Sequence, residues 1–163
     1  MFDYKTFETI AGWAVSRAIN ESSWIFPLVQ AFHLVALGFL AGAILMVDLR
    51  LLGSGFSNQP IAKVARDARP WLLASLVAMV LTGVPQFMSL ATKEYESPYF
   101  RWKMMFLLTA LIWTFTVKRM VAYSPEGRFG GGLAKLVALV SIGLWTSVAI
   151  NGRLIVRSSA ALP

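Results

Sequence analysis

The chain has 163 residues, of which 57% are apolar and only 14% are charged, and its mean hydropathy is +0.64. A water-soluble domain of this composition would expose large apolar patches, so the sequence predicts a membrane protein. There is no cysteine, which excludes disulfides and thiolate chemistry, and the formal charge of +7 comes mainly from basic residues at the edges of apolar segments, which indicates membrane lipid rather than nucleic acid as a partner.

The predicted elements begin with a short helix over residues 3–20. Phe7, Ile10 and Ala14 recur there at helical spacing, which favours an amphipathic helix lying on the membrane surface. Four apolar segments follow, at 24–47, 71–91, 100–117 and 133–150, each close to the length that crosses a hydrocarbon layer of about 30 Å. Gly53 ends the first segment and Pro98 opens the third. We therefore expect an all-α integral membrane four-helix bundle, with 1–163 forming a single transmembrane domain.

The orientation of the bundle follows from the basic residues between the segments. The loops after the first and third segments are expected to hold eight of them, namely Arg50, Lys63, Arg66, Arg69, Lys118, Arg119, Arg128 and Lys135, and the opposite side holds seven. The positive-inside rule then places these loops in the cytoplasm and both termini on the other side.

His33 is the only histidine of the chain and lies deep in the first segment. It follows Trp24 by nine residues, which places it about 14 Å below that end of the helix, near the middle of the membrane. Successive helical steps put Gln30, His33 and Asp48 on one stripe, and such polar groups in hydrocarbon need a partner or a function. This stripe should face the interior of the bundle.

The second segment carries a matching stripe of mildly polar residues, which includes Ser75, Thr82 and Gln86. We expect it to face His33. Pro85 cannot donate a backbone hydrogen bond and crowds the carbonyl of Leu81, so the helix is expected to bend near Thr82.

Antiparallel packing brings one end of each segment to the same side of the membrane. The polar residues expected to gather there are Gln30, His33, Gln86, Tyr95, Arg101, Lys103, Asn151 and Arg153. Two interpretations of this cluster remain open. In one, His33 binds the iron of haem b, Arg101, Lys103 and Arg153 hold its anionic groups, and Tyr95, Trp102 and Trp145 form pocket walls. In the other, His33 makes a hydrogen bond between helices, to Gln86 or to the carbonyl freed by Pro85, and the basic residues extend to lipid headgroups.

Copper transport is a further alternative, because the chain has seven methionines and thioethers suit Cu(I). Methionine is also an ordinary apolar filler, and the sequence has no closely spaced methionine ladder. Gly38 and Gly42 form a GxxxG pair on the face away from His33, which indicates close packing against another helix, in the bundle or in a dimer.

Several short motifs carry a resemblance to known families: VDLRLLG (47–53), RPW (69–71), LTG (81–83), YFRWKMMFLL (99–108) and NGRLI (151–155). They resemble an uncharacterised family of small bacterial four-helix inner-membrane proteins, a domain of unknown function. The order is also distantly similar to the four-helix protoporphyrinogen oxidase and copper-resistance D families. That similarity implies haem b ligation by His33 and an essential lysine at Lys103. The chain departs from it in having one histidine, which excludes two-histidine ligation within one chain.

The sequence thus predicts a haem b protein of the bacterial inner membrane that exchanges electrons with a quinone or a porphyrin-like molecule. His33 is the predicted metal ligand and Lys103 the predicted catalytic residue, and the cofactor-binding set is Gln30, His33, Gln86, Tyr95, Arg101, Lys103, Trp145, Asn151 and Arg153. Whether the chain is itself an oxidoreductase or an electron-transfer subunit stays open at this point. The alternative is a non-enzymatic copper permease, or a structural subunit of a homo-oligomer or larger membrane complex.

Overall fold

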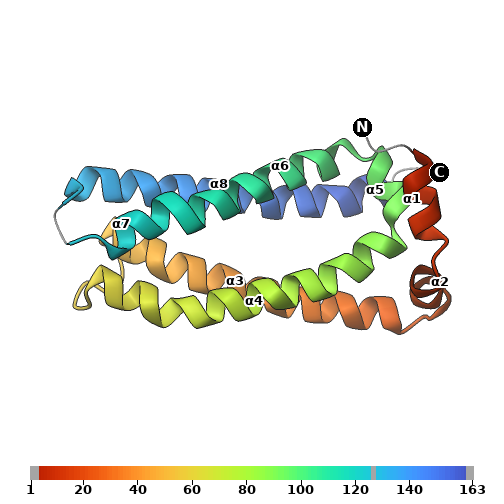
Figure 1. Ribbon diagram of the computed structural model, residues 1–163, viewed down its shortest axis with the longest axis horizontal. Helices are drawn as coiled ribbons and strands as arrows, with labels where there is room; N and C mark the ends of the chain where they lie inside the picture. Colours follow the sequence, from red (N-terminus) through yellow and green to blue (C-terminus); the bar gives the residue numbers. More distant parts are fainter. Residues whose placement is uncertain (1–3, 126–127, 161–163) are drawn as a thin grey trace.

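The structure, a computed structural model, describes residues 4–125 and 128–160, and their regular elements are all helical (Figure 1). In chain order these are α1 (Tyr4–Ala11), α2 (Ala14–Glu21), α3 (Ile25–Leu52), α4 (Ile61–Ser89), α5 (Ala91–Glu96), α6 (Pro98–Trp113), the π-helical turn η1 (Thr114–Lys118), α7 (Arg119–Tyr123) and α8 (Gly130–Ala160). The predicted all-α class is confirmed.

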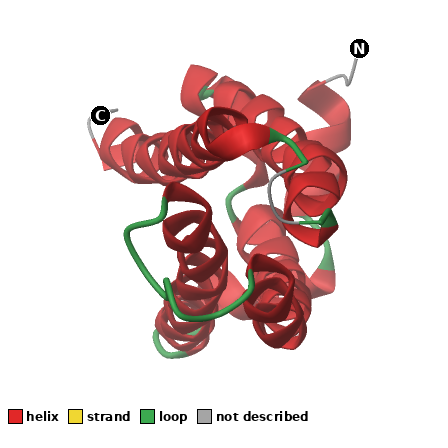
Figure 2. Ribbon diagram, turned by 90° about the vertical axis from the view of Figure 1, so that its left-hand side faces the viewer, coloured by secondary structure: helices red, strands yellow, loops and turns green. Residues whose placement is uncertain are grey.

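Four of the helical stretches are long and apolar enough to cross a membrane: Ile25–Leu52, Ile61–Ser89, Pro98–Tyr123 and Gly130–Ile155. The α3 and α4 helices lie side by side, α6 lies along α8, and the two pairs stack into a four-helix bundle (Figures 1 and 2). Large apolar side chains such as Trp24 and Leu81 are exposed on its outer surface, as expected for contact with lipid.

The ends of the helices follow local chemistry. Gly53 ends α3 with a φ of 77°, a left-handed conformation that glycine adopts without strain, and Pro98 is at the start of α6. The second helix begins at Ile61, ten residues before the predicted segment. Its first turns are too charged to resemble a membrane span, but Val64 and Ala68 are buried on one face, so the extension is amphipathic.

The single helix predicted over 3–20 is wrong in one respect, because the chain breaks at Gly12 and Trp13 to give α1 and α2. Trp13 is extended, with φ −65° and ψ 150°. Both helices fold across one end of the bundle (Figure 1). The fully buried hydroxyl of Ser16 lies 2.8 Å from the carbonyl of Met88, and Asn20 donates to the carbonyl of Ser89 at 3.1 Å. These side chains therefore satisfy carbonyls that the end of α4 leaves unpaired.

A core of buried apolar residues lies at the other end of the bundle. A buried cluster from α3, α4, α7 and α8 consists of small and branched residues: Val47, Leu51, Ala65, Ala68, Val121, Ala122, Val137 and Ala138. The bundle thus has one end held by apolar packing and one end covered by α1 and α2, and His33 lies toward the covered end.

Candidate functional site

His33 is half-buried on α3 and faces α4, as predicted. Its Nδ1 lies 2.8 Å from the hydroxyl oxygen of Thr82. The Thr82 hydroxyl in turn donates to the carbonyl of Ala78, at 2.6 Å. The partner of His33 is therefore Thr82 and not Gln86, whose side-chain amide donates back to the carbonyl of Thr82 on its own helix.

This chain of contacts favours one tautomer of the imidazole. A threonine hydroxyl has one hydrogen, and here it is given to Ala78, so the Thr82 oxygen can only accept from His33. In the neutral ring Nδ1 then carries the proton, and Nε2 keeps its lone pair. Nε2 makes no hydrogen bond among the described residues, so it is available to a metal or to a proton donor.

Gly83 allows the imidazole to lie close to α4. A Cβ atom at this position would be 3.2 Å from Cε1 of His33 and 3.8 Å from Nδ1. Any larger residue would push against a ring that its bond to Thr82 holds in place. The LTG motif (81–83) therefore supplies both the hydrogen-bond partner of His33 and the space for its ring.

Lys103 of α6 lies in the same region of the bundle as His33. It is half-buried, its charge acts on both His33 and Glu94, and its Nζ lies 3.8 Å from where a Cβ of Gly152 would be. Residues of α3, α4, α6 and α8 thus meet at this level of the bundle, together with Glu94 of α5. We call His33, Thr82, Gly83, Lys103 and Gly152 the histidine site.

Glu94 was not among the predicted residues. Its Oε2 is buried and finds no hydrogen-bond partner in the described part of the chain. Burial raises the pKa of this carboxyl to about 7, against the opposing effect of the Lys103 charge. Its position depends on α5, a six-residue helix that packs against α1. A helix this short has no sequence periodicity from which its burial could be predicted.

The other predicted residues are placed around the histidine site or apart from it. Gln30 is half-buried one turn before His33, whereas Arg101 and Arg153 are exposed. The side chain of Asn151 donates to the carbonyl of Ser147 on its own helix, the ring of Tyr95 packs on Phe7 at a centroid distance of 4.9 Å, and Trp145 donates to the hydroxyl of Thr114 at 3.1 Å.

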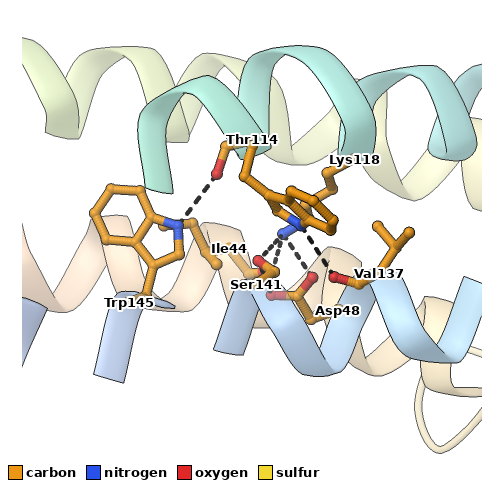
Figure 3. A network of polar contacts seen from close by, with 8 residues as sticks. Ile44, Asp48, Thr114, Lys118, Val137, Ser141 and Trp145 are labelled. Atoms are coloured by element: carbon orange, nitrogen blue, oxygen red, sulfur yellow. Dashed lines mark hydrogen bonds and ion pairs between the residues drawn. The ribbon is translucent and has the colours of Figure 1, made fainter. Parts of the chain in front are cut away.

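A second polar cluster, missed at the level of sequence, lies deeper toward the opposite end (Figure 3). The ammonium group of Lys118 lies 2.7 Å from Oδ1 of Asp48, 3.1 Å from the carbonyl of Ile44 and 3.3 Å from the hydroxyl of Ser141. Ser141 donates to Oδ2 of Asp48 at 2.8 Å. We call Asp48, Lys118 and Ser141 the buried ion cluster, and at 15 residues along α3 it lies about 22 Å from His33.

The prediction that Lys118 belongs to a loop is wrong. The third span does not end at residue 117 but continues through η1 into α7, and the Lys118 side chain is only 4% exposed. A π-helical turn fits an additional residue into the helix and so changes which side chains face inward. The sequence holds one signal for this cluster. An acid on the inward stripe of the first span needs a partner, and the first and third spans run in the same direction, so their final turns lie at the same end of the bundle.

These features define a multi-pass membrane protein built as a four-helix bundle, with a histidine site near one end and a buried ion cluster near the other. The chain belongs to the family of unknown function DUF6644, whose model matches residues 22–158. No curated protein and no solved structure matches it. The predicted membership of an uncharacterised family is thereby confirmed, and the distant likeness to the protoporphyrinogen oxidase and copper-resistance D families stays a prediction.

Proposed function

We propose that the protein binds haem b through Nε2 of His33 and exchanges electrons within the membrane with a quinone or a porphyrin-like molecule. The observation that carries the proposal is the contact of Nδ1 with Thr82, whose hydroxyl also faces the carbonyl of Ala78, because it favours the tautomer in which Nε2 keeps a free lone pair inside a four-helix bundle. Histidines that bind metals usually have their second nitrogen held by such a hydrogen bond. When bound, haem supplies reversible one-electron oxidation and reduction.

Lys103 is the residue best placed to hold an anionic group beside His33. It is half-buried, and a charge-assisted contact to a carboxylate is stronger there than at the surface. In this proposal it binds one haem propionate or the carboxylate of a porphyrin-like substrate. Arg101 and Arg153 are exposed and would bind the other propionate or lipid headgroups.

Haem has more support than a metal site made of histidine and carboxylate side chains alone. No group of three or more histidine, aspartate and glutamate side chains capable of holding a metal ion occurs within the described residues. Haem brings four nitrogen ligands of its own, so a single histidine is sufficient.

One observation favours a second candidate, a structural subunit of a homo-oligomer or larger complex. Cβ atoms at Gly38 and Gly42 would meet no described atom within 4 Å, so the bundle itself has room for larger residues at both positions. They line an apolar groove of about 420 Å³ on the outer surface, beside Phe39 and Trp71. A helix of another chain could approach closely there.

We place the protein in a bacterial inner membrane with both termini in the periplasm. Lys118 and Lys103 lie inside the bundle, and leaving both out of the loop count keeps seven basic residues on the predicted cytoplasmic side and six on the other. Cysteines introduced at the exposed positions Ser57 and Lys93 test this. An impermeant maleimide added to intact cells should label the second and not the first, and the reverse result inverts the topology.

The haem proposal is tested by the absorption spectrum of the protein purified in mild detergent from haem-replete cells. We expect a Soret band that shifts on reduction with dithionite and is lost in His33→Ala. Thr82→Val removes the hydrogen bond to Nδ1 at nearly constant volume and should weaken haem retention without abolishing it. A colourless preparation that also fails to take up added haem contradicts the proposal, and elemental analysis of the same sample distinguishes iron from copper.

A further inference from the structure

A cleft of about 90 Å³ lies between α4 and the η1 and α7 turns, at the end of the bundle away from α1 and α2. Its walls are mostly apolar, and its polar lining consists of Arg69, Thr114, Lys118, Arg119 and Tyr123. Its described lining residues include no acid. At Lys118, which belongs to the buried ion cluster, the cleft is about 22 Å from His33 along the bundle.

Lys118 is not free to bind a ligand in this cleft. Its ammonium group has three hydrogens, and three acceptors surround it, on Asp48, Ser141 and Ile44. It forms the floor of the cleft with its charge already balanced by Asp48, which is 0% exposed. Any attraction for an anion must come from other residues.

Arg69 and Arg119 supply that attraction. Both side chains are exposed at the cleft, and neither has an acidic partner in the part of the chain that the structure describes. The acid nearest to Arg69 on α4 is Asp67, which is paired with Lys63 at 3.2 Å. The mouth of an apolar cleft thus carries two positive charges with no acidic partner among residues 4–125 and 128–160.

The depth of the cleft matches the boundary between lipid headgroups and hydrocarbon. The α4 helix has 29 residues, about 43 Å at 1.5 Å per residue, against a hydrocarbon layer of about 30 Å. Its charged residues all lie in the first nine positions, so the excess length belongs at that end. Trp71 and Tyr123 are 59% and 40% exposed at the same level, where aromatic residues line membrane interfaces.

We propose that this cleft binds an anionic phospholipid. The phosphate lies between the guanidinium groups of Arg69 and Arg119, which match phosphate oxygens in pairs, and the Tyr123 hydroxyl is a further donor. One acyl chain runs along Leu72, Leu73 and Phe115. Two uncompensated charges select a headgroup with net negative charge over a zwitterionic one, as in other basic pockets between membrane helices. A neutral quinone would gain no ion pair from these two charges.

The test compares lipid binding by the full chain in detergent, using native mass spectrometry and thermal unfolding with added phosphatidylglycerol or phosphatidylcholine. We expect phosphatidylglycerol to bind and to raise the unfolding temperature, and phosphatidylcholine to do so far less. The double variant Arg69→Gln and Arg119→Gln should weaken phosphatidylglycerol binding by roughly tenfold or more, since it removes two charge-assisted contacts. The matched control, Arg17→Gln and Arg66→Gln, changes the net charge equally at exposed residues that do not line the cleft.

Three outcomes would overturn the proposal. Equal weakening in the control pair would mean that only net charge attracts the lipid. Equal binding of both lipids would mean that the headgroup charge is not recognised. An equal rise in unfolding temperature with millimolar glycerol phosphate in place of lipid would mean that the ligand is a soluble anion. The conservative pair Arg69→Lys and Arg119→Lys distinguishes lost binding from misfolding. It keeps both charges but loses the paired geometry of the guanidinium groups, so it should bind phosphatidylglycerol at an intermediate level.

Discussion

Asp48 and Lys118 form an ion pair that is closed off from the surface of the bundle, with Nζ 2.7 Å from Oδ1 and side chains 0% and 4% exposed (Figure 3). Ser141 and the carbonyl of Ile44 complete the set of partners. The pair joins α3, the η1 turn and α8 at one level. Because each charge is buried, the stability of the bundle depends on keeping both or removing both.

The first prediction is that Lys118→Met destabilises the bundle strongly and that adding Asp48→Asn recovers most of the loss. The single variant leaves a buried, uncompensated carboxylate, which costs about 3 to 5 kcal/mol. In the double variant no charge remains, and the asparagine oxygen can still accept from Ser141. Urea or thermal unfolding in detergent measures both changes in the free energy of unfolding.

Lys135→Met is the control for this pair, because Lys135 is exposed. It should change the stability by less than about 1 kcal/mol. Equal destabilisation by the single and double variants would contradict the view that the cost comes from an unpaired charge.

The second prediction concerns the tautomer of His33. Because this is the only histidine, the imidazole nitrogens of a ¹⁵N-histidine-labelled sample give one pair of signals. We expect a protonated Nδ1 and an unprotonated Nε2 in the metal-free protein at neutral pH, because Thr82 gives its hydrogen to Ala78. Thr82→Val should mix the two tautomers. Nε2 protonated in the wild type would remove the basis of the haem proposal.

The third prediction is that Gly83→Ala disturbs the histidine site. The added methyl group would lie 3.2 Å from Cε1 of His33, and the ring cannot retreat without lengthening its bond to Thr82. We expect a loss of about 1 kcal/mol in stability and a change in the imidazole signals. Gly143→Ala is the matched control, since its methyl group would meet nothing within 4 Å and alanine favours helix. An unchanged His33 signal in the Gly83 variant would mean that the ring is not held.

Much of the fold could be predicted because it follows from one-dimensional signals. Long apolar runs mark the spans, and Gly53 and Pro98 mark helix ends through backbone chemistry that depends on nothing distant. The inward stripe with Gln30, His33 and Asp48 follows from helical geometry alone. Its residues are half-buried or buried in the structure, as expected.

The partners of these residues could not be predicted, because they depend on three-dimensional packing. Lys118 lies in the π-helical turn η1, and this turn directs its side chain to Ile44 of α3 and Ser141 of α8. Glu94 is buried only because α5 packs against α1. Helical spacing puts Thr82 on the stripe that faces His33, but the hydrogen bond between them depends on the close approach that Gly83 allows.

The fourth prediction is that Ser16→Ala loosens the helices that cover the end of the bundle. The fully buried Ser16 hydroxyl lies 2.8 Å from the carbonyl of Met88 and 2.9 Å from that of Ile10, and its loss leaves these two acceptors with one shared donor fewer away from water. We expect a cost of about 1 to 2 kcal/mol and faster amide hydrogen exchange in α1 and α2 than in α4. Ser23→Ala, at an exposed position, should change neither. Uniformly faster exchange throughout the protein would indicate global destabilisation instead of release of these helices.

The fifth prediction is a pH dependence of stability that comes from Glu94. This carboxyl lies outside the membrane spans, and burial raises its pKa from an ordinary 4.5 to about 7 in the folded protein. Between these two pH values the folded state therefore holds one more proton than the unfolded state. Raising the pH through this window removes stability, by up to about 3 kcal/mol at 1.36 kcal/mol per pKa unit, and above pH 7 the loss is complete.

Glu94→Gln isolates this contribution, because glutamine resembles the protonated acid and does not titrate. Relative to the variant, the wild type should lose stability between pH 4.5 and pH 7 and remain at a constant difference above it. Lys103, whose charge acts on Glu94, is present in both proteins, so the difference between them reports on Glu94. Glu8→Gln, at an exposed acid of α1, should leave the pH profile of the wild type unchanged. A difference between wild type and Glu94→Gln that stays flat across this window would show that Glu94 is ionised and solvated in the folded protein, and its burial beside Lys103 would then have no energetic consequence.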